Sequence, residues 1–75
     1  MDFETLKYEK AAEGYVVITL NRPERLNAFS RKLNEEMGLA IHEVLKDDEV
    51  KCFIITGAPR PDGRPCFSAG GDLKD

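Results

Sequence analysis

The stretch with the most chemical potential is a turn of small residues made of Ala69, Gly70, Gly71 and Asp72. It follows an extended segment that begins at Cys66 and precedes what the pattern predicts to be the start of a helix. Backbone N–H groups in a first helical turn have no intrahelical partner, so they can donate to an anion or to an oxygen that gains negative charge. The Gly71 N–H is the predicted donor. Adjacent glycines also occur where a chain simply turns tightly, so the pattern alone leaves both interpretations open.

Acidic, imidazole and thiol side chains give weaker signals. Glu36 and Glu43 are predicted to lie on the solvated face of a helix, and His42 is likewise expected at the surface. Asp72 is expected to be a first-turn helix residue and not an acid catalyst. Cys66 could act as a nucleophile, but no basic residue is placed to activate it, so a small, buried or half-buried thiol is expected. We expect no metal site.

Two strands and a helix are predicted ahead of this turn. Residues 6–10 and the β-branched run 15–20 are expected to pair as an antiparallel hairpin, which ends at Pro23. Residues 30–46 change to a helical period, with Ser30 as the N-cap. The apolar face of this helix is predicted to contain Leu33, Met37, Ala40, Ile41, Val44 and Leu45.

A third strand is predicted from Val50 to Thr56 because its centre is a continuous apolar run. Such runs are typical of parallel strands that are covered on both faces. Strand, helix and strand form a βαβ unit, yet the chain supplies only one long helix to cover this strand. We expect the remaining cover to come from further sequence or from partner subunits. The proline-rich residues 58–65 are predicted to form a surface loop, in which Arg60 and Arg64 are solvated.

Size and charge limit the classes of function. The chain has 75 residues, about half the usual length of a domain, so we expect it to be part of a larger protein. Its net charge of −3 argues against nucleic-acid binding. It shows no signal peptide and no membrane-spanning run, and its two cysteines do not form a disulfide framework. These features predict a cytoplasmic protein that does not contact membranes.

Three motifs together resemble the crotonase family, the enoyl-CoA hydratases and isomerases. They are Asn-Arg-Pro-Glu-Arg-Leu-Asn-Ala at 21–28, Phe-Ile-Ile-Thr-Gly at 53–57, and Cys-Phe-Ser-Ala-Gly-Gly-Asp-Leu at 66–73. Each motif is weak alone, but they occur in the order and at the spacing of the family. The resemblance implies an α/β fold in which residues 1–75 form the N-terminal ββαβ portion of a crotonase-like spiral, incomplete as a domain.

The resemblance also implies specific roles. Crotonase-like enzymes stabilise a thioester enolate with two backbone N–H groups, and the first corresponds here to Gly71. Arg25 is the best candidate for a contact with the phosphates of coenzyme A (CoA), because a guanidinium suits phosphate oxygens. The second donor and the catalytic glutamates have no counterpart in this chain, which should therefore be inactive alone. The residues implied to bind the acyl-CoA are Arg25, Leu26, Asn27, Ala28, Ala69, Gly70, Gly71, Asp72 and Leu73.

The implied reaction is the hydration of an acyl-CoA or the isomerisation of its double bond. No cofactor is expected beyond the CoA that is part of the substrate, and the full-length protein is expected to be a homotrimer or hexamer. Another crotonase-type reaction is an alternative: thioester hydrolysis, C–C cleavage or a ring-forming condensation. A chain that binds CoA without turnover is a further alternative from a different class.

Overall fold

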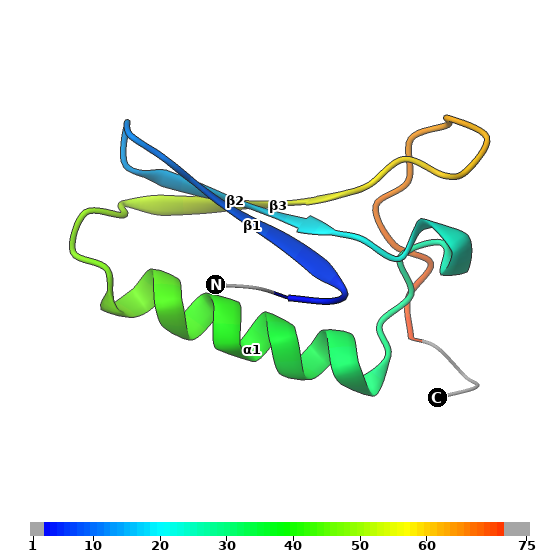
Figure 1. The fold of residues 1–75 in the computed structure, drawn as a ribbon, viewed down its shortest axis with the longest axis horizontal. Coiled ribbons are helices and arrows are strands. Elements are labelled where there is room, and N and C mark those ends of the chain that lie inside the picture. Colours follow the sequence, from blue (N-terminus) through cyan, green and yellow to red (C-terminus); the bar gives the residue numbers. More distant parts are fainter. Residues whose placement is uncertain (1–2, 72–75) are drawn as a thin grey trace.

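A three-stranded sheet with one long helix beneath it forms the body of the molecule (Figure 1). The computed structural model describes residues 3–71. In chain order the elements are β1 (Leu6–Ala11), β2 (Tyr15–Leu20), the 3-10 helix η1 (Pro23–Arg25), α1 (Arg31–Lys46) and β3 (Cys52–Gly57).

The sheet has the order β1-β2-β3, with β2 in the centre. β1 and β2 pair antiparallel, with Leu6 opposite Leu20 and Ala11 opposite Tyr15. β2 and β3 pair parallel, with Tyr15 opposite Cys52 and Leu20 opposite Gly57. The predicted hairpin and βαβ unit are therefore confirmed. β2 has the predicted ends, whereas β1 and β3 differ from the predicted strands by one or two residues, because pairing across the sheet and not local composition sets those limits.

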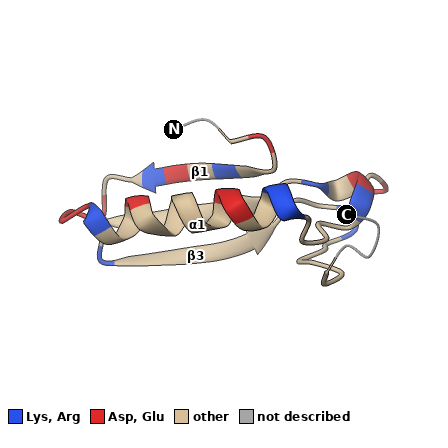
Figure 2. Ribbon diagram, turned by 90° about the horizontal axis from the view of Figure 1, so that it is seen from below, with Lys and Arg blue, Asp and Glu red and all other residues tan. Residues whose placement is uncertain are grey.

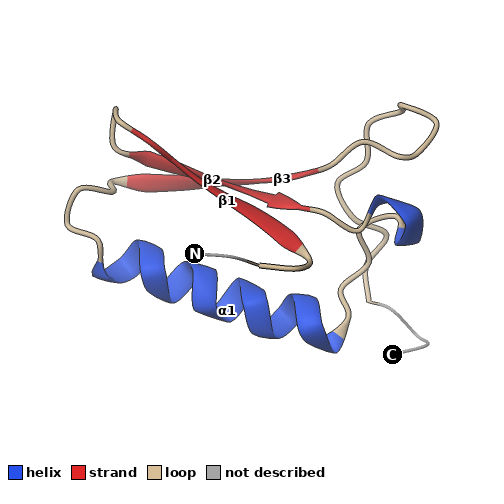
Figure 3. Ribbon diagram, viewed as in Figure 1, coloured by secondary structure: helices blue, strands red, loops and turns tan. Residues whose placement is uncertain are grey.

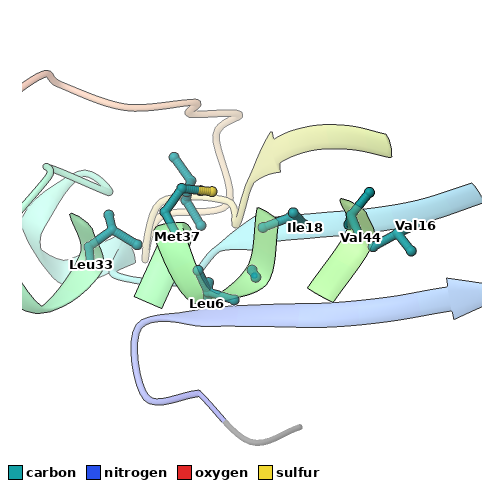
Figure 4. Close-up of a cluster of buried hydrophobic side chains, with 8 residues drawn as sticks. Leu6, Val16, Ile18, Leu33, Met37 and Val44 are labelled. Atoms are coloured by element: carbon teal, nitrogen blue, oxygen red, sulfur yellow. The ribbon is translucent and has the colours of Figure 1, made fainter. Parts of the chain in front are cut away.

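The helix α1 begins where the sequence predicts, because the Ser30 side chain accepts a hydrogen bond from the Leu33 N–H at 3.1 Å. This bond satisfies one of the N–H groups that the first helical turn leaves without an intrahelical partner. Figure 4 shows side chains of α1 meeting those of β1 and β2 between the helix and the sheet. The buried residues of this core are Leu6, Val16, Ile18, Leu20, Leu33, Met37, Ala40 and Val44.

Two predictions about the faces of α1 are wrong. Glu36 was expected on the solvated face, yet it is only 5% exposed. It lies three residues after Leu33 and four before Ala40, so the helical period places it beside the buried face. Leu45 was expected in the core and is 76% exposed. It is one residue beyond the buried Val44, which turns it about 100° around the helix axis and away from the sheet.

The Glu36 carboxylate is buried because it binds the segment that leads into β1. It accepts hydrogen bonds from the backbone N–H groups of Glu4, at 2.9 Å, and Thr5, at 2.7 Å, and from the Thr5 hydroxyl at 2.6 Å. A buried charge with three donors is acceptable, whereas one without partners is costly. Burial opposes ionisation, but these hydrogen bonds outweigh it and hold the pKa of Glu36 below its usual value.

The strand β3 differs from the other two in composition and exposure. Figure 2 shows that it carries no charged residue, whereas β1 carries several. Phe53, Ile54 and Ile55 are nevertheless 37%, 50% and 37% exposed. The strand prediction is confirmed, but residues 3–71 do not provide the cover on both faces that its composition predicts.

The chain from residue 58 to residue 70 forms no helix or strand, and Gly71 forms a single bridge with Phe29. The segment at Cys66 and Phe67, predicted to be extended, therefore does not join the sheet. The predicted helix start at Asp72 lies outside the described residues. No helix within residues 3–71 is both long enough and apolar enough to cross a membrane.

Candidate functional site

Two loops meet beyond one end of the sheet, and they contain most of the predicted site residues. β2 and β3 are parallel, so their carboxyl ends lie at the same edge, where Leu20 is opposite Gly57. Figure 3 shows the chain leaving β2 and β3 on this side and the two loops crossing each other there. The first loop covers residues 21–30, and the second covers residues 58–71. In open α/β sheets this edge is where ligands usually bind.

The first loop is a compact turn with an unusual backbone. After η1, both Leu26 and Asn27 have a φ angle of 53°. Asparagine tolerates this left-handed conformation, whereas leucine adopts it rarely. Backbone hydrogen bonds hold the turn: the Leu26 N–H donates to the Pro23 carbonyl at 3.1 Å and the Asn27 N–H to the Arg22 carbonyl at 2.8 Å. The Arg22 guanidinium donates to the Ala28 carbonyl.

The side chain of Asn27 is fully buried, at 0% exposure, and connects both loops. Its Oδ1 accepts from the Arg22 N–H at 2.8 Å. Its Nδ2 donates to the Ala58 carbonyl at 2.9 Å and to the Cys66 carbonyl at 3.3 Å. All three partners are backbone groups, so the amide substitutes for the ladder that these irregular segments lack.

The second loop approaches the first through its last residues. The Ala69 N–H donates to the Leu26 carbonyl at 2.9 Å, and the Phe29 N–H donates to the Gly70 carbonyl at 2.7 Å. Gly70 has a φ angle of 102°, which favours glycine. The turn that contains the predicted donor therefore lies directly beside the Leu26–Phe29 segment.

The Gly71 N–H has no hydrogen-bond partner among residues 3–71. Gly71 is exposed, and a Cβ built on it would meet nothing within 4 Å. No side chain of Gly71 itself, and no described atom near its Cα, therefore stands in the way of a ligand. An exposed main-chain N–H of this kind is able to donate one hydrogen bond to an oxygen that develops negative charge, and the role of Gly71 as that donor stays a prediction.

The structure brings together most of the residues expected to bind the acyl-CoA. Arg25, Leu26, Ala69 and Gly70 are exposed around the meeting point of the two loops, and Leu26 is bonded to Ala69. Asn27 and Ala28 belong to the same loop, but their side chains are buried. A ligand contact from this loop would therefore come from Arg25, from Leu26 or from the backbone. Asp72 and Leu73 lie outside the described residues.

Charged residues of the second loop interact with each other. Arg60 and Arg64 both pair with Asp62, at 3.4 and 2.9 Å. The backbone N–H of Arg64 and its guanidinium both donate to Asp62 and lower the pKa of that carboxyl. The expectation that the two arginines are solvated loop charges agrees with this exposed cluster.

The remaining candidate side chains do not converge on the loops. Cys66 is half-buried, as expected, with its Sγ 3.6 Å from the Leu26 carbonyl oxygen. His42 is exposed on α1, and Glu43 pairs with Lys46 at 3.0 Å. Within residues 3–71 no group of three histidine, cysteine or acidic side chains could hold a metal ion.

Sequence reasoning did not anticipate the structural role of Asn27. The signal available was weak: asparagine is favoured at left-handed positions, and Asn27 follows a proline-initiated turn. Its partners at Ala58 and Cys66 are 31 and 39 residues away, so no local pattern could reveal them.

Comparison with known proteins identifies the family. Residues 10–75 match the model of the family described as enoyl-CoA hydratase/isomerase. The chain belongs to the enoyl-CoA hydratase/isomerase family. The match includes both loops that meet at the candidate site.

Two relatives are similar over the whole chain. The chain is 39% identical over 75 residues to the 1,2-epoxyphenylacetyl-CoA isomerase of Escherichia coli (strain K12). The aligned region is 100% of this chain and 26% of that protein. The chain is 40% identical over 76 residues to the short-chain-enoyl-CoA hydratase of Clostridium acetobutylicum, and covers 27% of that protein. The chain therefore spans about a quarter of the length of these relatives.

Solved structures of the family show the same arrangement. An enoyl-CoA hydratase/isomerase from Xanthobacter autotrophicus Py2 superposes with a TM-score of 0.85 at 36% identity, over 97% of this chain and 25% of that one. One from Mycobacterium paratuberculosis superposes with a TM-score of 0.84 at 38% identity, over 97% and 26%. The sheet and helix thus match the N-terminal portion of the crotonase fold, which confirms the predicted fold class.

Proposed function

We propose that this chain is the N-terminal part of an enzyme that hydrates an enoyl-CoA or isomerises its double bond, and that Gly71 supplies one of the two donors of its oxyanion hole. The observation that carries the proposal is the exposed Gly71 N–H, which has no partner within residues 3–71. Family membership supports an acyl-CoA thioester as the substrate.

The chemistry explains why a main-chain donor suits this reaction. Forming a carbanion beside a thioester places negative charge on the thioester oxygen, which becomes an enolate oxygen, and protonating that carbanion removes the charge again. A fixed N–H that faces this oxygen stabilises the enolate more than the neutral carbonyl, so it lowers the barrier. We expect the acid–base groups that move the protons to come from residues beyond those described, because Glu36 is bonded to Thr5, Glu43 pairs with Lys46 and Asp62 pairs with Arg64.

Hydration and double-bond isomerisation share this enolate step, and relatives of nearly equal similarity are named a short-chain-enoyl-CoA hydratase and a 1,2-epoxyphenylacetyl-CoA isomerase. The proposal is therefore a reaction that passes through this enolate. The acid–base residues would determine whether the product is hydrated or isomerised. Hydrolysis, C–C cleavage and ring-forming condensation of acyl-CoA thioesters use the same donor and are the alternatives within the family.

Two substitutions at Gly71 test the proposal in the full-length protein that contains this chain. Gly71→Pro removes the N–H, whereas Gly71→Ala keeps it and places a Cβ in open space. With crotonyl-CoA as the probe, proline should lower kcat by about 10² to 10³, and alanine should change it far less. Circular dichroism of both variants checks that they are folded. Equal kcat values for the two folded variants would contradict the role of Gly71.

A further inference from the structure

We propose that Asn27 is a positioning residue for this reaction: its buried carboxamide fixes the second loop against the first so that the Gly71 N–H faces the thioester oxygen. The inference rests on the proposed function and adds a residue that does not itself touch the substrate. Three observations support it: the orientation of the amide, the connections that lead from it to Gly71, and the scarcity of apolar packing around the two loops.

The amide is used in one orientation only. Its oxygen faces one N–H, from Arg22, and its nitrogen faces two carbonyls, from Ala58 and Cys66. Both donors and the acceptor are therefore occupied by three separate backbone segments. An aspartate of the same shape would place an oxygen against two carbonyl oxygens, and this would cost both hydrogen bonds in a buried environment.

A short chain of hydrogen bonds connects Asn27 to Gly71. The residue before Asn27, Leu26, accepts from the Ala69 N–H at 2.9 Å. Phe29, two residues after it, donates to the Gly70 carbonyl at 2.7 Å and bridges Gly71. Asn27 itself holds Cys66, where this segment begins. The amide therefore fixes one end of the stretch 66–71, and its own loop fixes the other.

Apolar packing contributes little to this placement. Among residues 21–29 and 58–71, the buried residues are Asn27, Ala28 and Ala58, and the last two present only a methyl group. The spacing of the loops thus depends on hydrogen bonds, which are directional, more than on hydrophobic burial, which is not.

Position matters because an oxyanion donor works over a narrow range of distance. The N–H must lie about 2.7–3.1 Å from the oxygen that carries the charge. A displacement of about 1 Å can cost as much as 10²-fold in rate. Since this contact strengthens in the transition state, a displaced donor should lower kcat and leave KM nearly unchanged.

The test uses two substitutions of Asn27 in the full-length protein, with crotonyl-CoA as the substrate. Asn27→Asp keeps the shape and the acceptor but removes both donors. Asn27→Gly removes the side chain while accepting the φ angle of 53° without strain. Both should lower kcat by about tenfold or more while KM changes by less than about twofold. Hydrogen exchange of the Ala69 amide should become faster in both.

Glu36→Gln is the matched control, because Glu36 is also a buried polar group that holds two segments together, but its carboxylate binds Glu4 and Thr5 in the segment that leads into β1 and has no hydrogen bond to residues 58–71. It should reduce stability without changing kcat. Unchanged kcat in both Asn27 variants of an active protein would overturn this inference alone. Wild-type protein without turnover of enoyl-CoA would overturn the proposed function and this inference with it. If neither variant shows a cooperative melt, Asn27 determines folding and the positioning role is wrong.

Discussion

The layered half of the molecule and its loop half are held together by different forces. In the layered half, α1 packs on β1 and β2 through fully buried apolar side chains such as Val16, Ile18 and Leu33. In the loop half, residues 21–30 and 58–71 surround a single fully buried polar side chain, Asn27, and are joined by main-chain hydrogen bonds.

This difference separates stability from geometry. Apolar burial is roughly proportional to area and does not depend on direction, so the layered half supplies most of the free energy of folding. Each hydrogen bond contributes only about 0.5–1.5 kcal/mol but fixes a direction. Substitutions in the layered half should therefore reduce stability, and substitutions in the loop half should mainly change the placement of reacting groups.

The largest effect on stability is expected from the core of α1. Leu33→Ala removes a fully buried side chain and should lower the free energy of unfolding by about 2–5 kcal/mol. Leu39→Ala, at a half-exposed position of the same helix, should change it by less than about 0.5 kcal/mol. Urea denaturation of the full-length protein measures both. Similar losses of unfolding free energy in the two variants would show that the buried apolar core does not supply most of the stability of the layered half.

The next effect is expected where the two halves meet, at Gly57. A Cβ there would lie 2.8 Å from the Phe67 Cα and would also collide with the Cys66 carbonyl. Gly57→Ala should therefore cost about 1–3 kcal/mol and displace the second loop, so that kcat falls as well. Gly38→Ala is the control, because its Cβ meets nothing within 4 Å and alanine favours a helix by about 0.5–1 kcal/mol. Thermal denaturation measures the loss of stability, and steady-state kinetics measure the fall in kcat. If Gly57→Ala changed neither, the close approach of Cys66 and Phe67 to Gly57 would be wrong.

A smaller and pH-dependent effect is expected at Glu36. Its pKa in the folded protein is lowered from 4.5, so its contribution is fully present above about pH 4.5 and is lost as the pH falls through the folded pKa. Glu36→Gln should lower the free energy of unfolding by about 1–3 kcal/mol at pH 7, and the difference from wild type should shrink on acidification. Urea titrations at pH 7 and pH 4 measure it, with the exposed Glu35→Gln as control. A difference in the free energy of unfolding that stays constant with pH would show that the ionised Glu36 carboxylate is not what stabilises the fold.

The smallest effect is expected at Arg25, on the exposed rim of the loop half. If its guanidinium contacts a CoA phosphate, the contact exists equally in ground and transition states, so Arg25→Ala should raise KM by up to about fivefold and leave kcat unchanged. Arg64→Ala, which removes a residue paired with Asp62, should leave both constants unchanged. Steady-state kinetics with crotonyl-CoA measure them, and an unchanged KM for Arg25→Ala would remove Arg25 from the site.

Local sequence determined the elements and their order. A β-branched run, a helical period that starts at a serine cap and an apolar run bounded by glycine each act within a few residues. These signals predicted the hairpin, the helix α1 from Ser30 and the parallel strand β3, and the structure confirms them. The order and spacing of the three motifs also predicted the family, which the family model confirms over residues 10–75. The motifs include both loops that meet at the candidate site.

The tertiary structure decided which polar groups are buried. Glu36 and Asn27 are buried because donors and acceptors 31 to 39 residues away reach them, and no local pattern encodes such partners. It also decided that Leu45 is exposed and that β3 is only partly covered within residues 3–71, since burial depends on which surface lies opposite. Composition states which residues prefer to be buried; only packing provides the partner that buries them.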